Sequence, residues 1–173
     1  MSQTIDLLIK NGSCFIDGKL EKVDLAVNNS QIQEIGKLKN LEGKSEVDAK
    51  DLLVLPGVID TQVHFREPGS TEAEDLNSGS KAAILGGVTS VFEMPNTNPP
   101  TSSKKEFLNK LRLAKNRMFC NYGFYFGATP ENYNNLGDLK DLEGCCGIKL
   151  FVGSSTGNLL VKNISKLHPQ PQI

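Results

Sequence analysis

Residues 53–69 read LVLPGVIDTQVHFREPG, and they decide how the rest of the chain is interpreted. The apolar run over residues 52–59 is too short for an amphipathic helix and predicts a buried strand. Polar side chains then follow at alternate positions, namely Asp60, Gln62, His64 and Arg66. Because alternate residues of a strand point to the same face, we expect these four side chains to share one side of the chain. Together they predict a polar site for a cation, an anion or both.

The composition is typical of a globular protein. Of the 173 residues, 38% are hydrophobic and 23% are charged, and the net charge is −1. No block of like charge suggests a nucleic-acid partner, and no apolar run approaches the roughly 18 residues of a membrane span. The first residues lack the pattern of a signal peptide, so we expect a cytoplasmic protein. The four cysteines fit neither zinc spacing nor a disulfide framework, which predicts buried free thiols.

The N-terminal part predicts a sheet of short strands joined by tight turns. The turn signals are Asn11-Gly12, Asp17-Gly18 and the polar residues 28–30. Close, regular spacing of this kind indicates antiparallel pairing. The strands expected from the pattern cover residues 4–10, 13–16, 21–28, 31–36 and 46–55.

From residue 57 onward, strands alternate with helices, which indicates parallel β-α-β units and an α/β barrel. The expected strands cover residues 58–63, 88–94, 122–126 and 147–152. The expected helices cover residues 71–85 and 102–117, with a shorter helix within residues 131–142. The first helix should turn Ala82, Ala83 and Leu85 inward, and the second should open on Ser102 and carry Phe107, Leu108, Leu111 and Leu113 on its apolar side.

A complete barrel of this type has eight strands in about 250 residues, whereas four strands are predicted here. Residues 158–167 predict only one weak element, and the proline-containing tail, with an exposed His168, predicts no regular structure. We expect about half of a barrel, shortened from a longer ancestor. A half-barrel that was itself selected is the alternative. Either would leave a strand edge and an apolar face uncovered, and would need a partner or a second copy to cover them.

The motif in residues 56–69 resembles the opening metal motif of the amidohydrolase superfamily, and most closely that of its dihydroorotase and hydantoinase branch. That motif has the form P-G-x-I-D-x-H-x-H-x-R-E-P-G. The resemblance implies a small β-sandwich segment over residues 1–55. It implies the first four β/α units of a TIM-type barrel over residues 56–161, followed by an irregular tail over residues 162–173.

The resemblance also assigns roles to individual residues. His64 would bind zinc, and Arg66 would bind a substrate carboxylate. Residues 93–97 (EMPNT) match a second motif of the branch, in which the asparagine, here Asn96, binds the substrate. Without the resemblance, the prolines and asparagines of that segment would favour a simple turn.

Residues 147–153 (GIKLFVG) resemble a strand whose lysine is carboxylated and bridges two metal ions, which would make Lys149 a metal ligand. Burial among apolar neighbours would favour the neutral amine that reacts with carbon dioxide. A lysine that extends to the strand end and stays an ammonium is the alternative.

One position departs from the family pattern. Gln62 stands where the first zinc-binding histidine is expected, and an amide oxygen is a weak ligand for zinc. The family implies one or two zinc ions, and Gln62 weakens that expectation. The remaining metal histidines and the catalytic aspartate come from later strands in the family, so no catalytic residue is assigned here.

Two functions are consistent with these observations. The first is a dihydroorotase-type hydrolase by descent, acting on N-carbamoyl-L-aspartate and L-dihydroorotate in pyrimidine synthesis but inactive as this chain alone. The second is a non-catalytic relative that acts as a structural partner, for example of aspartate carbamoyltransferase, or a degraded gene product.

Overall fold

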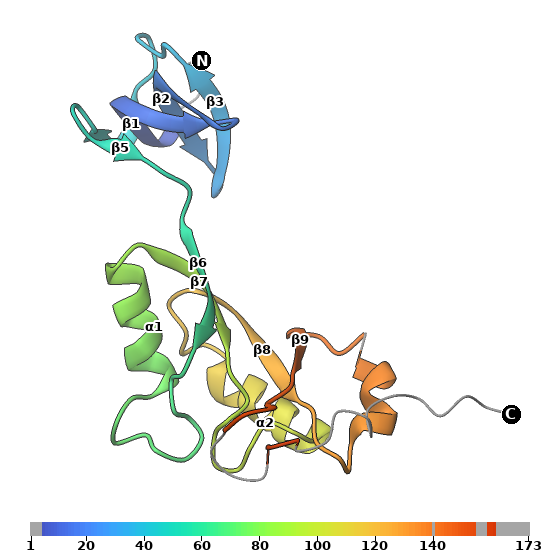
Figure 1. Ribbon diagram of the computed structural model, residues 1–173. Helices are drawn as coiled ribbons and strands as arrows, with labels where there is room; N and C mark the ends of the chain where they lie inside the picture. Colours follow the sequence, from blue (N-terminus) through green and yellow to red (C-terminus); the bar gives the residue numbers. More distant parts are fainter. Residues whose placement is uncertain (1–4, 140, 155–158, 162–173) are drawn as a thin grey trace, which may run out of the picture. The chain divides into compact units, whose positions relative to one another are not determined.

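The computed structural model describes residues 5–139, 141–154 and 159–161. Two compact units make up the chain, Met1–Pro56 and Gly57–Ile173. Each unit is described by itself below (Figure 1). The tail predicted over residues 162–173, including His168, and most of the weak element predicted over residues 158–167 lie outside the described residues.

The first unit is a five-stranded sheet. Three strands follow one another in order β3-β2-β1, and β4 and β5 both pair with β1. Two-residue turns with positive φ at both positions, Asp17-Gly18 and Asn29-Ser30, join β1 to β2 and β2 to β3. That geometry suits antiparallel hairpins, and both predicted turns are confirmed. The strands are β1 (Ile5–Ile16), β2 (Lys19–Asn28), β3 (Gln31–Gly36), β4 (Gly43–Asp48) and β5 (Leu53–Val54).

The turn predicted at Asn11-Gly12 is wrong, because β1 runs through it without a break. Asn11 has a φ of 62°, and the register with β2 shifts between Ile9 and Gly12. The positive φ therefore serves a bulge instead of a hairpin. Gly12 is required there, since a Cβ at this position would lie 2.6 Å from Cγ2 of Val54.

The prediction of a purely antiparallel sheet is also wrong, because β4 and β5 pair with β1 in parallel. The strand predicted over residues 46–55 is split between these two strands. Ala49 is buried at the break, Asp51 takes a φ of 62°, and the N–H of Leu52 donates to the Ala49 carbonyl at 3.0 Å. This turn lets one segment supply two short edge strands.

The second unit is a parallel sheet in the order β6-β7-β8-β9, with helices between the strands. It has the architecture predicted from the alternating pattern, the first four strands of a TIM-type barrel. The strands are β6 (Val58–Val63), β7 (Val88–Glu93), β8 (Asn121–Gly127) and β9 (Cys145–Lys149). The helices are α1 (Leu76–Leu85), α2 (Lys104–Ala114) and the 3-10 helix η1 (Tyr133–Leu139).

Several boundaries in this unit differ from the prediction. Helix α1 begins five residues late, because Asp75 caps it by accepting a 2.6 Å hydrogen bond from the N–H of Ser78. Helix α2 is capped by Ser103 instead of Ser102. Strand β9 begins at Cys145 and ends at Lys149, because its pairing with β8 starts opposite Phe124.

The inward face of α1 was predicted correctly for Ala83, which packs against the core, but wrongly for Ala82 and Leu85. Leu85 is 81% exposed and Ala82 is exposed, whereas Leu76, Gly79 and Ser80 are buried. Leu85 follows Leu76 by nine residues, which is two and a half helical turns and therefore the opposite face.

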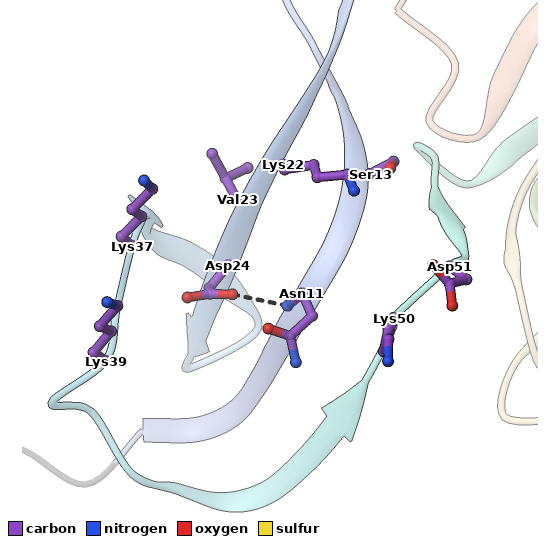
Figure 2. A pocket seen from close by; sticks show the side chains of 9 residues that line it. All are labelled: Asn11, Ser13, Lys22, Val23, Asp24, Lys37, Lys39, Lys50 and Asp51. Carbon is purple, nitrogen blue, oxygen red and sulfur yellow. Dashed lines mark hydrogen bonds between the residues drawn. The ribbon is translucent and has the colours of Figure 1, made fainter.

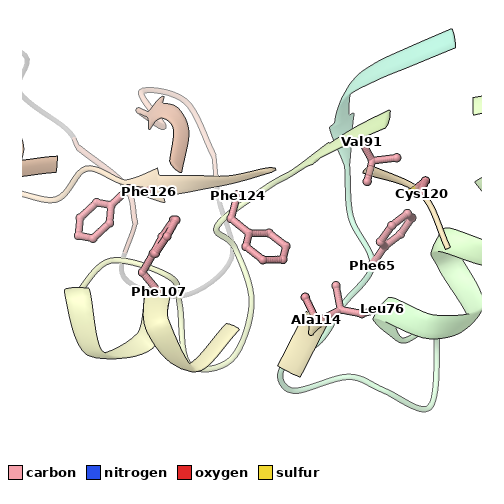
Figure 3. Close-up of a cluster of buried hydrophobic side chains, with 8 residues drawn as sticks. All are labelled: Phe65, Leu76, Val91, Phe107, Ala114, Cys120, Phe124 and Phe126. Atoms are coloured by element: carbon pink, nitrogen blue, oxygen red, sulfur yellow. The ribbon is translucent and has the colours of Figure 1, made fainter. Parts of the chain in front are cut away.

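The core of the second unit lies between β7, β8 and the two helices (Figure 3). The rings of Phe107 and Phe124 meet edge to face at 6.3 Å. Leu111 and Leu113 pack against this core as predicted, but Leu108 is 48% exposed. The eight buried members are Phe65, Leu76, Val91, Phe107, Ala114, Cys120, Phe124 and Phe126.

The cysteines are free, and two of them, Cys14 and Cys120, are buried as predicted. The adjacent pair Cys145 and Cys146 is only half-buried. None of the helices in the described residues has the length and apolar character needed to cross a membrane.

Candidate functional site

The candidate site lies where the parallel strands of the second unit end. All four strands run in the same direction, so their C-terminal ends meet at one edge of the sheet. The segments after β6 and β7 carry the two motifs singled out in the sequence. They are joined by backbone hydrogen bonds from the N–H of Met94 to the Val63 carbonyl at 3.0 Å and from the N–H of Asn98 to the Pro68 carbonyl at 2.9 Å.

His64 and Asn96 meet at this edge. Nδ1 of His64 lies 2.8 Å from Oδ1 of Asn96, and both side chains are partly buried. An amide oxygen only accepts hydrogen bonds, so the neutral imidazole carries its proton on Nδ1. In that tautomer Nε2 is the ring nitrogen whose lone pair can bind a cation. The contact brings one residue of each motif together at this edge of the sheet.

Alternation along residues 60–66 holds only as far as the strand. Strand β6 ends at Val63, with Asp60 and Gln62 exposed and the N–H of Gln62 donating to Oδ1 of Asp60 at 2.9 Å. In the described part of the chain no hydrogen bond joins the side chain of Gln62 to His64. Asp60 and Gln62 therefore lie on the strand, whereas His64 and Arg66 follow it, and the expectation that all four share one side stays a prediction.

Arg66 lies beyond the strand with a φ of 61°, and its side chain is exposed. The preceding residue, Phe65, is buried in the core. The buried phenylalanine anchors this segment, while the neighbouring guanidinium stays accessible to a ligand. A guanidinium is well matched to a carboxylate, because its fork can donate two hydrogen bonds at once.

Lys149 is the last residue of β9 and is half-buried. Its Nζ lies 5.2 Å from the ring centroid of Phe151, and its carbonyl accepts from the N–H of Ala128 at 2.9 Å. A cation above an aromatic face is a favourable arrangement for an ammonium. Carboxylation of this lysine stays a prediction.

The donor set does not by itself fit a zinc site. Among the described residues, no group of three or more histidine, cysteine, aspartate or glutamate side chains is placed to hold a metal ion. Zinc in proteins usually takes three or four such ligands. The described residues offer the imidazole of His64, the amine of Lys149 and, at the position of the missing histidine, the exposed amide of Gln62.

A bidentate ion pair that the sequence did not predict supports the first motif. Arg117 donates to both carboxylate oxygens of Glu67, from Nη1 to Oε1 at 2.7 Å and from Nη2 to Oε2 at 3.0 Å. Oε2 also accepts from the N–H of Leu76 at 2.9 Å. Glu67 is buried and lies within the motif, but its partner is 50 residues away and carries no signal of its own.

A second unpredicted pair lies beneath the site. Glu93 at the end of β7 and Lys110 in α2 form an ion pair with 1% and 0% of their side chains exposed. Burial raises the pKa of Glu93 to about 7, against the opposing effect of Lys110, and burial lowers the pKa of Lys110. A sequence signal existed, because Lys110 falls between Phe107 and Ala114 on the buried face of the helix.

A separate hollow of about 470 Å³ lies in the first unit (Figure 2). It is lined by Lys22, Lys37, Lys39 and Lys50, together with Asn11, Ser13, Val23, Asp24 and Asp51. The carboxylate of Asp24 already accepts from the N–H groups of Asn11 and Leu38, at 2.8 and 3.0 Å. The hollow contains no residue of either motif and is not part of the candidate site.

Comparison with known proteins shows the family. Residues 53–170 match the model of the amidohydrolase family, and the chain belongs to that family. It is 37% identical over 158 residues to a dihydroorotase of Methanosarcina mazei, covering 91% of this chain and 34% of the relative. It is 36% identical over 147 residues to an allantoinase of Desulfitobacterium hafniense, covering 84% and 32%.

Solved structures agree with the fold. The chain is similar to an L-hydantoinase from Arthrobacter aurescens with a TM-score of 0.82 and 26% identity, over 91% of this chain and 35% of that one. The predicted fold, a β-sandwich segment followed by about half of a TIM-type barrel, is confirmed, as is the resemblance to the dihydroorotase and hydantoinase branch. The chain spans about a third of the length of the curated relatives it matches.

Proposed function

We propose that this protein is, by descent, a dihydroorotase-type hydrolase of cyclic amides. The reaction class interconverts N-carbamoyl-L-aspartate and L-dihydroorotate in pyrimidine synthesis and depends on a metal ion in the family. Similarity to a curated dihydroorotase supports this proposal. The observation that carries it is the 2.8 Å contact between His64 and Asn96, which joins the two motifs of the branch in one site.

In this proposal Arg66 and Asn96 bind the carboxylate of the substrate. Arg66 is exposed in the segment that follows β6. Asn96 lies in the segment that follows β7, and backbone hydrogen bonds join the two segments. Both N-carbamoyl-L-aspartate and L-dihydroorotate carry a carboxylate, whereas allantoin does not. An accessible guanidinium therefore favours the first pair of compounds over the substrate of the allantoinase relatives.

We further propose that the 173-residue chain does not catalyse this reaction alone. His64 and Lys149 are the proposed metal ligands, and Gln62 replaces a stronger one. In the described residues these donors do not complete a zinc site. A chain that binds the substrate but lacks the group that activates water should have affinity without turnover.

A non-catalytic role as a structural partner is the alternative, and a specific observation favours it. The two outer strands of the sheet expose large apolar side chains, with Val58 and Ile59 on β6 at 55% and 59% and Ile148 on β9 at 47%. Unpaired strand edges with exposed apolar residues are typical association surfaces. A second copy or aspartate carbamoyltransferase are the candidate partners. The cytoplasmic location expected from the sequence stays a prediction.

The two roles are separated by assaying the pure chain with L-dihydroorotate, with and without added zinc, alone and mixed with aspartate carbamoyltransferase. The proposal predicts no turnover by the chain alone. Turnover above the buffer rate by the chain alone would contradict it. Co-elution with the carbamoyltransferase, together with no binding of either carboxylate compound, would favour the structural role.

A further inference from the structure

The buried pair Glu93 and Lys110 lies at the second motif, of which Glu93 is the first residue. Its side chains are almost completely removed from water, and the Oε2 atom of Glu93 has no hydrogen-bond partner in the described residues apart from its ion-pair contact with Lys110. Buried ion pairs contribute little net stability, because desolvation offsets their attraction. The contacts of the two side chains with the motif segments indicate a role other than stability.

Glu93 lies beside the first motif. Strand β7 pairs Glu93 with Val63, the residue before His64. Burial raises the pKa of its carboxyl group, whereas the backbone N–H of Phe65 and the guanidinium of Arg66 both lower that pKa. The carboxylate is therefore placed next to the segment from which both the imidazole and the guanidinium of the candidate site project.

Lys110 holds the second motif. Its Nζ donates to the Met94 carbonyl at 3.1 Å and to Oγ1 of Thr101 at 3.4 Å. Thr101 in turn donates its N–H to the Pro95 carbonyl at 2.9 Å. The ammonium therefore fastens both ends of residues 94–101, the loop that carries Asn96.

We propose that the Glu93–Lys110 pair is a positioning element that sets the His64–Asn96 contact and the place of Arg66. Glu93 lies beside the first motif through the pairing of β7 with β6, Lys110 holds the loop of the second motif, and the ion pair joins the two side chains. Apolar side chains of the same size would fill the space, but they would leave the Met94 carbonyl without the Lys110 donor. The inference rests on the proposed function only for the identity of the ligand, since the contacts themselves do not depend on it.

The test compares Glu93→Gln and Lys110→Met with Leu136→Ala in the full chain. Leu136 packs against the same core from η1 and touches neither motif in the described contacts, so it controls for lost stability. The first readout is the ¹⁵N spectrum of the His64 ring. The second is the affinity for N-carbamoyl-L-aspartate.

Both pair variants should lose the preference of His64 for a proton on Nδ1, and should weaken binding by on the order of tenfold. Leu136→Ala should leave the His64 spectrum and the affinity unchanged at a similar loss of stability. If only one of Glu93→Gln and Lys110→Met folds, the result for that variant alone tests the proposal. A His64 spectrum and affinity like those of the parent in a folded pair variant would overturn the proposal. If the parent chain binds no ligand, the proposed function fails, and the His64 spectrum alone still decides the positioning role.

Discussion

Nδ1 of His64 lies 2.8 Å from Oδ1 of Asn96, although 32 residues separate them in sequence. The contact exists because two neighbouring parallel strands end at the same edge and their following segments are joined by backbone hydrogen bonds. It leaves Nε2 as the ring nitrogen that can bind a cation. The site can thus present an imidazole lone pair and a guanidinium together.

Removing the amide acceptor should change the proton position on His64. In Asn96→Leu the ring should shift toward the form protonated on Nε2, which free imidazole side chains prefer, because no oxygen remains to hold the Nδ1 proton. Two-bond ¹H–¹⁵N correlation of the ring checks this directly. Asn98→Ala, an exposed change on the same loop, should leave the spectrum as it is.

Loss of the bidentate arginine should destabilise the second unit. Arg117→Met leaves the buried Glu67 carboxylate with the Leu76 N–H as its remaining partner among the hydrogen bonds described above, at a cost of about 1–3 kcal/mol. Urea unfolding followed by tyrosine fluorescence reports this unit, because Tyr122, Tyr125 and Tyr133 all lie in it. Arg112→Met, which removes only a hydrogen bond to Asn109, should change the unfolding free energy much less. Equal losses in the two variants would count against a special role for the pair.

The cap of α1 should contribute a measurable stability. Asp75→Ala removes the acceptor for the N–H of Ser78 and should lower the unfolding free energy by about 1 kcal/mol. Asp75→Asn keeps an oxygen in place and should retain most of that free energy. Thermal or urea unfolding of both variants distinguishes capping from the loss of charge near Arg117, which lies 3.7 Å from Asp75.

Glu93 should make stability fall as the pH rises through neutrality. Burial raises its pKa in the folded chain from 4.5 to about 7, so the folded state binds the proton more tightly than the unfolded state. This contribution is fully present below pH 4.5 and is lost as the pH rises through about 7. Unfolding free energies measured between these values should decline for the parent chain and decline less for Glu93→Gln. An identical slope in both would show that Glu93 does not titrate in this range.

The sequence predicted those parts of the molecule that depend on local patterns. Strand β6 and the hairpin turns at Asp17-Gly18 and Asn29-Ser30 were found because alternation and turn residues act over a few positions. The signal at Asn11-Gly12 was misread, because the same positive φ serves a hairpin or a bulge and only the pairing with β2 decides between them.

The site was predicted in part. His64 and Asn96 were singled out by the resemblance of their motifs, but their contact was not predicted, since it depends on the pairing of β6 with β7. Their support was not predicted, because Glu67 and Arg117, like Glu93 and Lys110, meet only through the packing of helices on that sheet. The position of Lys110 on the buried face of α2 indicates that this lysine has a buried partner, but it does not identify Glu93 as that partner.

An NMR titration of the ¹⁵N-labelled chain with N-carbamoyl-L-aspartate, run in parallel on Arg66→Gln and Arg112→Gln, tests whether Arg66 binds the substrate carboxylate. We expect saturable shifts in residues 64–66 and 94–98 of the parent chain and of Arg112→Gln, loss of those shifts in Arg66→Gln, and no shifts with allantoin. Binding that survives Arg66→Gln, or no binding by the parent chain, would contradict this expectation.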